Sequence, residues 1–272
     1  MKWAPACAGL RITAAYDALN NSTETSLAGT KGPRPNWQLG ATSRSIRRVH
    51  NRALRIDGAE RMIGAGGTSE RRLEVFVQAI EGRVADRDGL RRQLDRWMSE
   101  LRPGARGYLG STAGVTDSGE AIAFARFESS ADAKANSERP EQGQWWAETE
   151  KCFDGEVRFT DSDDVDSFLA GGSNDARFVQ VMKGRQMDRD QVRALDEQFE
   201  AHAASFRPDL LGGFRMWTGH GSYIEVAYFT NEAEARQGES KEPPAELAAQ
   251  MSVFAAMMAN VEFTDLRDPW LF

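Results

Sequence analysis

Residues 177–190 read "RFVQVMKGRQMDRD", and 102 positions earlier residues 75–88 read "VFVQAIEGRVADRD". In both stretches an apolar run is followed by glycine, which predicts a β-strand. An aspartate then precedes a helical pattern in each, so Asp86 and Asp188 are candidate N-caps. The correspondence predicts that this chain builds one structural unit twice.

The sequence after each stretch continues the correspondence. Apolar side chains recur at helical spacing in 87–101 and 189–206, and each run stops at an Arg-Pro pair, where proline disfavours further helix. A glycine-rich hairpin, a second helical segment and a last strand, "VRFTDSDD" or "VEFTDLRD", follow. The order β-α-β-β-α-β, twice, predicts an α+β fold of two ferredoxin-like repeats, at 73–170 and 173–272. Between them, "DDVDSFLAGGSNDA" (163–176) is a candidate linker, with Gly171 and Gly172 at its flexible point.

The first 72 residues differ in composition from the rest. They carry a net charge of +7, whereas residues 73–272 carry −14, which together give the chain's −7. Three interpretations fit this polar, Arg- and Ser-rich segment: a disordered basic tail, a targeting peptide, or a mis-assigned start with translation beginning at Met62. We favour the third, because the composition changes near Met62, and mass spectrometry of the native N-terminus tests it.

Composition limits the partners and the compartment. The acidic repeats argue against nucleic acid, because phosphate repels such a surface. No run approaches the ~20 apolar residues of a membrane helix. The two cysteines, Cys7 and Cys152, give no metal-site spacing and no disulfide framework, so we expect a cytoplasmic protein without a metal.

Alternation along the first strands assigns their two faces. We expect the small aliphatic side chains to face the helices (Val77, Ala79, Val179 and Val181). Gln78 and Gln180 then point into the space between the sheets. A buried amide needs hydrogen-bond partners, so the two glutamines either satisfy each other and nearby backbone or line a ligand cavity.

The hairpins differ between the repeats. Ala121, Ala123 and Ala125 in the first correspond to Tyr223, Glu225 and Ala227 in the second. With Arg215 and Trp217 from the preceding strand, Tyr223 and Glu225 form a candidate binding site, and His220 lies in the adjoining turn. Glu225 and His220 are the candidate general bases. The alternative for His220 is an exposed turn residue.

The stretch "NSERPEQGQWW" (136–146) is the least generic in the chain. Arg139, Trp145 and Trp146 either cover a pocket and stack on a planar ligand, or pack as core. The sequence contains no phosphate-binding loop, dinucleotide fingerprint, HExxH motif or nucleophile elbow.

The element order and the repeat resemble the dimeric α+β barrel superfamily, which includes the antibiotic-biosynthesis-monooxygenase-like proteins. The resemblance covers about 200 residues, and "SERPEQGQWW" with "GGSNDARFVQVMKGR" also resembles a group of actinobacterial proteins of unassigned function. It implies two units packed sheet to sheet as a barrel within one chain, and hence a monomer with an internal pseudo-dimer, or a weak homodimer.

The resemblance also implies an activity: a cofactor-independent monooxygenase acting on an aromatic or polyketide-like compound. Gln78, Gln180 and Arg215 would then steady an enolate oxygen, His220 or Glu225 would take the proton, and Trp145 or Trp217 would stack on the ring. Two alternatives stay open. One is a non-catalytic ligand-binding or stress-associated scaffold. The other is a haem-binding protein with His220 as axial ligand, although the Asn-Trp-His constellation of haem-degrading relatives is not found.

Overall fold

The structure, a computed structural model, describes residues 75–272. The expectations for residues 1–72 lie outside this part of the chain. The first half of the described part contains β1 (Phe76–Arg83), α2 (Arg87–Arg96), β2 (Tyr108–Val115), β3 (Glu120–Phe127), α3 (Ser130–Ser137), α4 (Pro140–Thr149) and β4 (Arg158–Ser162). The second half contains β5 (Val165–Leu169), β6 (Phe178–Gly184), α5 (Arg189–Phe206), β7 (Leu210–Gly219), β8 (Ser222–Phe229), α6 (Glu232–Glu239), α7 (Ala248–Met257), β9 (Glu262–Leu266) and β10 (Trp270–Leu271).

Both predicted N-caps are present. The Asp86 carboxylate accepts a hydrogen bond from the Gly89 N–H at 2.8 Å, and Asp188 accepts one from the Gln191 N–H at 2.9 Å. Each carboxylate satisfies an N–H group that has no partner within the helix and lies at the positive end of the helix dipole. The two helices therefore begin at equivalent places within 75–88 and 177–190.

The strands form two antiparallel five-stranded sheets, in the orders β10-β2-β3-β1-β4 and β5-β7-β8-β6-β9. Each sheet takes one edge strand from the other predicted repeat, because β5 lies within 73–170 and β10 within 173–272. β5 pairs with β7, and the C-terminal β10 pairs with β2. The candidate linker is thus corrected in part, because Val165–Leu169 is a strand that completes the second sheet.

The two sheets pack face to face. One apolar core joins Val77, Ala79 and Phe124 of the first sheet to Val179, Val181, Phe214 and other residues of the second. The Phe124 and Phe214 rings lie 5.7 Å apart, and the hydroxyls of Thr112 and Tyr228 are 2.5 Å apart across the same interface. The predicted α+β class, with two ferredoxin-like units packed sheet to sheet, is confirmed.

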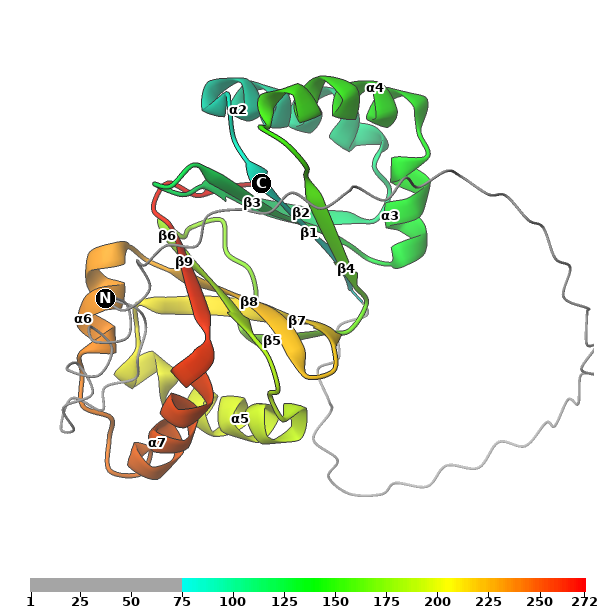
Figure 1. The fold of residues 1–272 in the computed structure, drawn as a ribbon. Helices are drawn as coiled ribbons and strands as arrows, with labels where there is room; N and C mark the ends of the chain where they lie inside the picture. The colour runs from blue at the N-terminus through cyan, green and yellow to red at the C-terminus, as the bar shows by residue number, and fades with distance from the viewer. Residues whose placement is uncertain (1–74) are drawn as a thin grey trace, which may run out of the picture. The chain divides into compact units, whose positions relative to one another are not determined.

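Helices cover the other face of each sheet. Figure 1 shows α2 and α4 over the first sheet, and α5 and α7 over the second. Within the second layer, Phe178 and Met182 of β6 pack with Val192 of α5, Ala235 of α6 and Met258. Among the described residues, no helix is both long and apolar enough to cross a membrane.

Candidate functional site

The assignment of strand faces made from the sequence is wrong. Val77, Ala79, Val179 and Val181 belong to the core between the sheets, and Gln78 and Gln180 lie on the opposite, helix-covered faces. Alternation separates the two faces of a strand, and it does not say which face meets the other sheet and which meets the helices. The core between the sheets takes aliphatic and aromatic side chains alike.

The two glutamines therefore do not face each other. Gln78 donates through Nε2 to Asp161 Oδ1 at 2.8 Å, and Gln180 donates to Asp265 Oδ1 at 3.0 Å. In both sheets the acceptor sits directly opposite on the neighbouring strand. These cross-strand pairs occupy equivalent places in the two sheets. We interpret them as structural hydrogen bonds between neighbouring strands, not as ligand contacts.

The structure brings together Arg215, Trp217, Tyr223 and Glu225 on the helix-covered face of the second sheet. The antiparallel register places Arg215 opposite Glu225 and Trp217 opposite Tyr223. The Arg215 guanidinium donates to Glu225 Oε2 at 2.7 Å and lies 5.9 Å from the centroids of both aromatic rings. Register alone thus makes one cluster from two adjacent strands.

Helix α5 adds a second carboxylate to this cluster. Arg215 Nη1 donates to Asp196 Oδ2 at 2.8 Å, so the guanidinium bridges two acids. Arg215 and Glu225 are only 1% and 5% exposed. A buried ion is costly unless it is paired and hydrogen-bonded, and here a single cation serves two carboxyl groups.

Burial decides the protonation of this cluster. Burial raises the pKa of Glu225; the Arg215 guanidinium counteracts the rise, and the Asp196 carboxylate adds to it. Burial alone would lower the pKa of Arg215, but Glu225 and Asp196 hold it above its ordinary value. Burial likewise raises the pKa of the Tyr223 phenol. Arg215 therefore stays charged, while Glu225 binds a proton more readily than an exposed glutamate does.

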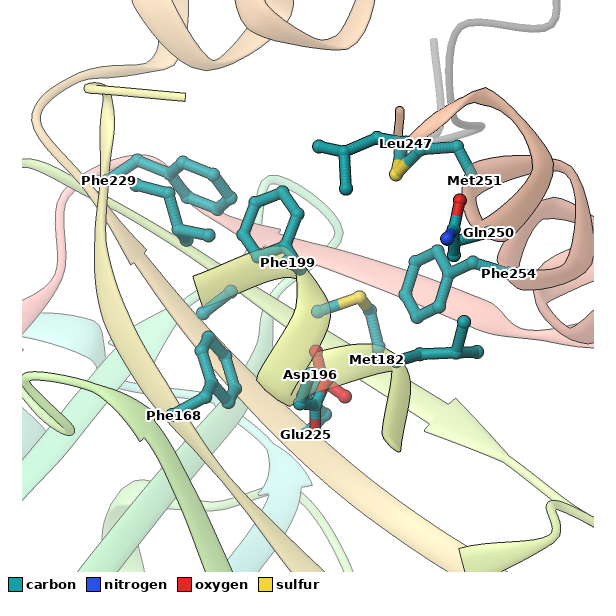
Figure 2. Close-up of a pocket in the computed structure, with 13 residues that line it drawn as sticks. Phe168, Met182, Asp196, Phe199, Glu225, Phe229, Leu247, Gln250, Met251 and Phe254 are labelled. Atoms are coloured by element: carbon teal, nitrogen blue, oxygen red, sulfur yellow. The ribbon is translucent and has the colours of Figure 1, made fainter. Parts of the chain in front are cut away.

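A cavity opens between this cluster and the helices. Its volume is about 60 Å³, room for a few water molecules. Figure 2 shows Asp196 and Glu225 together at one side, with aromatic and aliphatic side chains around the rest. The lining residues come from the sheet and from α5 and α7: Phe168, Met182, Leu195, Asp196, Phe199, Leu210, Glu225, Ala227, Phe229, Leu247, Gln250, Met251 and Phe254. An apolar cavity with a few convergent polar groups has the character of a ligand site.

The remaining predicted site residues lie elsewhere. Arg139 donates to the Leu101 carbonyl and to Asn136 Oδ1, Trp145 donates to the Gln93 carbonyl at 2.8 Å, and Trp146 packs on Phe159. All of these contacts are in the first unit. His220 is an exposed residue of the β7–β8 turn with φ of +51°. None of these four lines the cavity beside Glu225.

The first unit has no matching polar cluster. Ala113 and Ala123 stand opposite each other, as Arg215 and Glu225 do in the second unit. Trp270, from the C-terminal strand, packs with Ala113, Ala121 and Cys152, and the Arg91 guanidinium lies 5.4 Å from its ring centroid. The space that the small residues leave is therefore filled by an aromatic side chain from the other end of the described chain.

Sequence reasoning missed Asp196 and Gln250. Asp196 lies four residues after Val192 and three before Phe199, so it shares the apolar face of its helix. A lone acidic residue on the apolar face of a helix indicates a buried polar site, so Asp196 could have been singled out from the sequence. No comparable signal marked Gln250. The faces of α7 differ little in hydrophobicity, so the sequence does not show which face packs against the cavity.

The structure also bears on cofactors. In the described part of the chain, no group of three or more His, Cys, Asp or Glu side chains is arranged to hold a metal ion. The two histidines in this part, His202 and His220, do not line the cavity. The cavity therefore presents no imidazole to a haem iron, and the fit of haem to this site is poor.

Comparison with known proteins shows the fold alone. No family model matches the sequence, and no curated protein matches it. Among solved structures, a candidate monooxygenase from Fusobacterium nucleatum subsp. nucleatum matches with a TM-score of 0.56 at 8% identity, over 72% of this chain and 93% of that one. One from Lactobacillus acidophilus matches with a TM-score of 0.57 at 10% identity, over 73% and 99%. An anthrone oxidase-like protein matches with a TM-score of 0.51 at 11% identity, over 73% and 93%.

Proposed function

We propose that this protein binds a neutral, planar, largely apolar small molecule in the cavity beneath α5 and α7, and oxidises it with dioxygen without a cofactor. The observation that carries the proposal is the Arg215–Glu225–Asp196 cluster, whose two carboxyl groups line a cavity with mostly apolar walls. The names of the structures that share the fold, monooxygenase and anthrone oxidase-like, support the same class of chemistry.

In the proposed reaction Glu225 is the general base. Its carboxylate takes a proton from a ring CH₂ group that is conjugated with a carbonyl group through the ring, and the electron pair passes into an enolate. A raised pKa makes the carboxylate a stronger base than an exposed glutamate. The carbanion form of the enolate is oxidised by dioxygen. For an anthrone, the ring CH₂ becomes a carbonyl whose oxygen comes from dioxygen, and the second oxygen atom leaves as water with the two hydrogen atoms of the CH₂ group.

Arg215 acts as a positioning residue in this scheme. It does not line the cavity, and it holds both carboxyl groups that do. A fixed guanidinium keeps Glu225 oriented, and stabilises its charged form whenever the proton leaves. The apolar walls exclude water from the reacting carbon.

The small size of the cavity favours one alternative function, a non-catalytic ligand carrier. A volume of about 60 Å³ is smaller than a fused-ring compound, so such a ligand binds only if α7 shifts outward. A non-catalytic carrier that encloses a smaller ligand needs no such shift. Turnover separates the two functions, since a carrier binds ligand and consumes no dioxygen.

The test is oxygen uptake with anthrone, with quinone formation followed by absorbance. The native chain should consume dioxygen in step with quinone, and Glu225→Gln should lower the rate at least ~100-fold, the usual contribution of a general base. His220→Ala is the matched control and should keep the native rate. If Glu225→Gln turns over anthrone as fast as the native chain, the assigned base is wrong.

A further inference from the structure

The wall of the cavity formed by α7 contains a polar group with no partner. Gln250 lines the cavity between Leu247, Met251 and Phe254. Its Oε1 atom is buried and accepts no hydrogen bond from the described residues. Figure 2 shows the Gln250 amide among these apolar side chains, away from Asp196 and Glu225. A buried acceptor without a donor destabilises a fold, and a ligand that donates a hydrogen bond to it removes that penalty.

The cavity therefore has two separate polar ends. Glu225 and Asp196 form one, at the sheet and α5, and Gln250 forms the other, on α7. Phe168, Phe199 and other apolar side chains occupy the wall between them. A ligand that satisfies both ends is a ring compound with polar groups at opposite edges.

We infer that the ligand is a hydroxylated aromatic compound whose hydroxyl group hydrogen-bonds to Gln250 while its reacting edge faces Glu225. This inference rests on the proposed function and adds the chemical class of the ligand. A hydroxyl group both donates and accepts, so it satisfies the amide whichever of its oxygen and nitrogen atoms faces the ligand.

Gln250 is then a specificity-determining residue. A site that hydrogen-bonds a hydroxyl group rejects an analogue that lacks it, because the buried polar group is left unpaired. A methyl group of similar size fills the same space and offers no hydrogen bond. The preference for hydroxyl over methyl therefore reports on the amide itself.

The experiment is calorimetric titration of the full chain with phenol and with toluene, which are single-ring compounds, at a pH where the phenol is neutral. The native chain should bind phenol about tenfold more tightly, the equivalent of one buried hydrogen bond. Gln250→Leu should abolish that preference. Gln250→Met, of similar length, provides a second variant in case the first does not fold.

Gln93 offers a matched control. Its Oε1 atom is also buried without a partner, but Gln93 lies on α2 in the first unit and does not line the cavity. Gln93→Leu should therefore keep the tenfold preference. Equal binding of both compounds by the native chain, or a preference that survives Gln250→Leu, overturns this inference alone. Binding of neither compound overturns the proposed function as well.

Discussion

Lys183 of β6 donates a hydrogen bond to Glu81 of β1, and the two residues occupy equivalent positions in the two units, 102 residues apart. The ion pair therefore joins the first sheet to the second through opposite charges.

The first prediction concerns this pair. Glu81→Lys should lower the free energy of unfolding by about 1 kcal/mol, since both side chains are partly exposed (13% and 26%) and solvent weakens the interaction. The double variant Glu81→Lys with Lys183→Glu should recover most of the loss. Urea denaturation of the native chain, Glu81→Lys, Lys183→Glu and the double variant measures the four free energies of unfolding. If the two single changes add up to the double one, the two residues are not coupled.

The second prediction concerns Arg215, which is 1% exposed. Arg215→Met leaves the buried Glu225 and the partly buried Asp196 without their cation, and should destabilise the fold by about 3–5 kcal/mol. Arg267→Met is the control, because Arg267 is half-exposed in its ion pairs with Asp117 and Glu232 and should cost less than ~1 kcal/mol. Thermal or urea denaturation compares the stability of the two variants. Equal losses would show that the buried cluster contributes no more to stability than an exposed ion pair does.

The third prediction is a pH dependence that Glu225 imposes. Its pKa is raised in the folded state, so the folded chain binds the proton more tightly than the unfolded chain does. The stabilisation is complete below the ordinary glutamate pKa and is lost as the pH rises through the raised value.

Glu225→Gln removes this titration and keeps an acceptor for Arg215. The unfolding free energy of the native chain minus that of Glu225→Gln should therefore fall as the pH rises above the ordinary glutamate pKa. Urea denaturation across a pH series measures the difference. A difference that grows with pH would mean that the pKa of Glu225 is depressed in the fold.

The fourth prediction concerns the filled layer of the first unit. Trp270 is 5% exposed and packs where the second unit has its polar cluster. Trp270→Ala should destabilise the protein by about 3–5 kcal/mol through lost burial and a new cavity. Phe159→Ala is the control, since Phe159 is 48% exposed. A small apolar ligand that restores the melting temperature of Trp270→Ala would show that the new cavity is accessible.

Several features follow from local sequence, because they depend on neighbouring residues alone. The caps at Asp86 and Asp188 need only an oxygen at the start of a helical pattern. The strand order within each unit follows from hairpins, and the placing of Arg215 opposite Glu225 follows from hairpin register. The closeness of Arg215, Trp217, Tyr223 and Glu225 was accordingly predictable.

The direction in which those side chains point was not predictable. Alternation divides a strand into two faces and does not say which face meets a helix and which meets a sheet. Gln78 and Gln180 were assigned to the wrong side for this reason. Two strands were also missed: Val165–Leu169 lies inside an apparent linker, and Trp270–Leu271 is only two residues long.

The sequence by itself determined the α+β class, because it follows from periodicity and turn signals read along the chain. Only the tertiary structure decided that the cavity lies beneath α5 and α7, and that Asp196 and Gln250 line it with Glu225. Only it decided that Trp270 closes the equivalent space in the first unit. These outcomes depend on contacts between segments far apart in the chain, and side-chain volume in three dimensions decides which space is filled and which stays open.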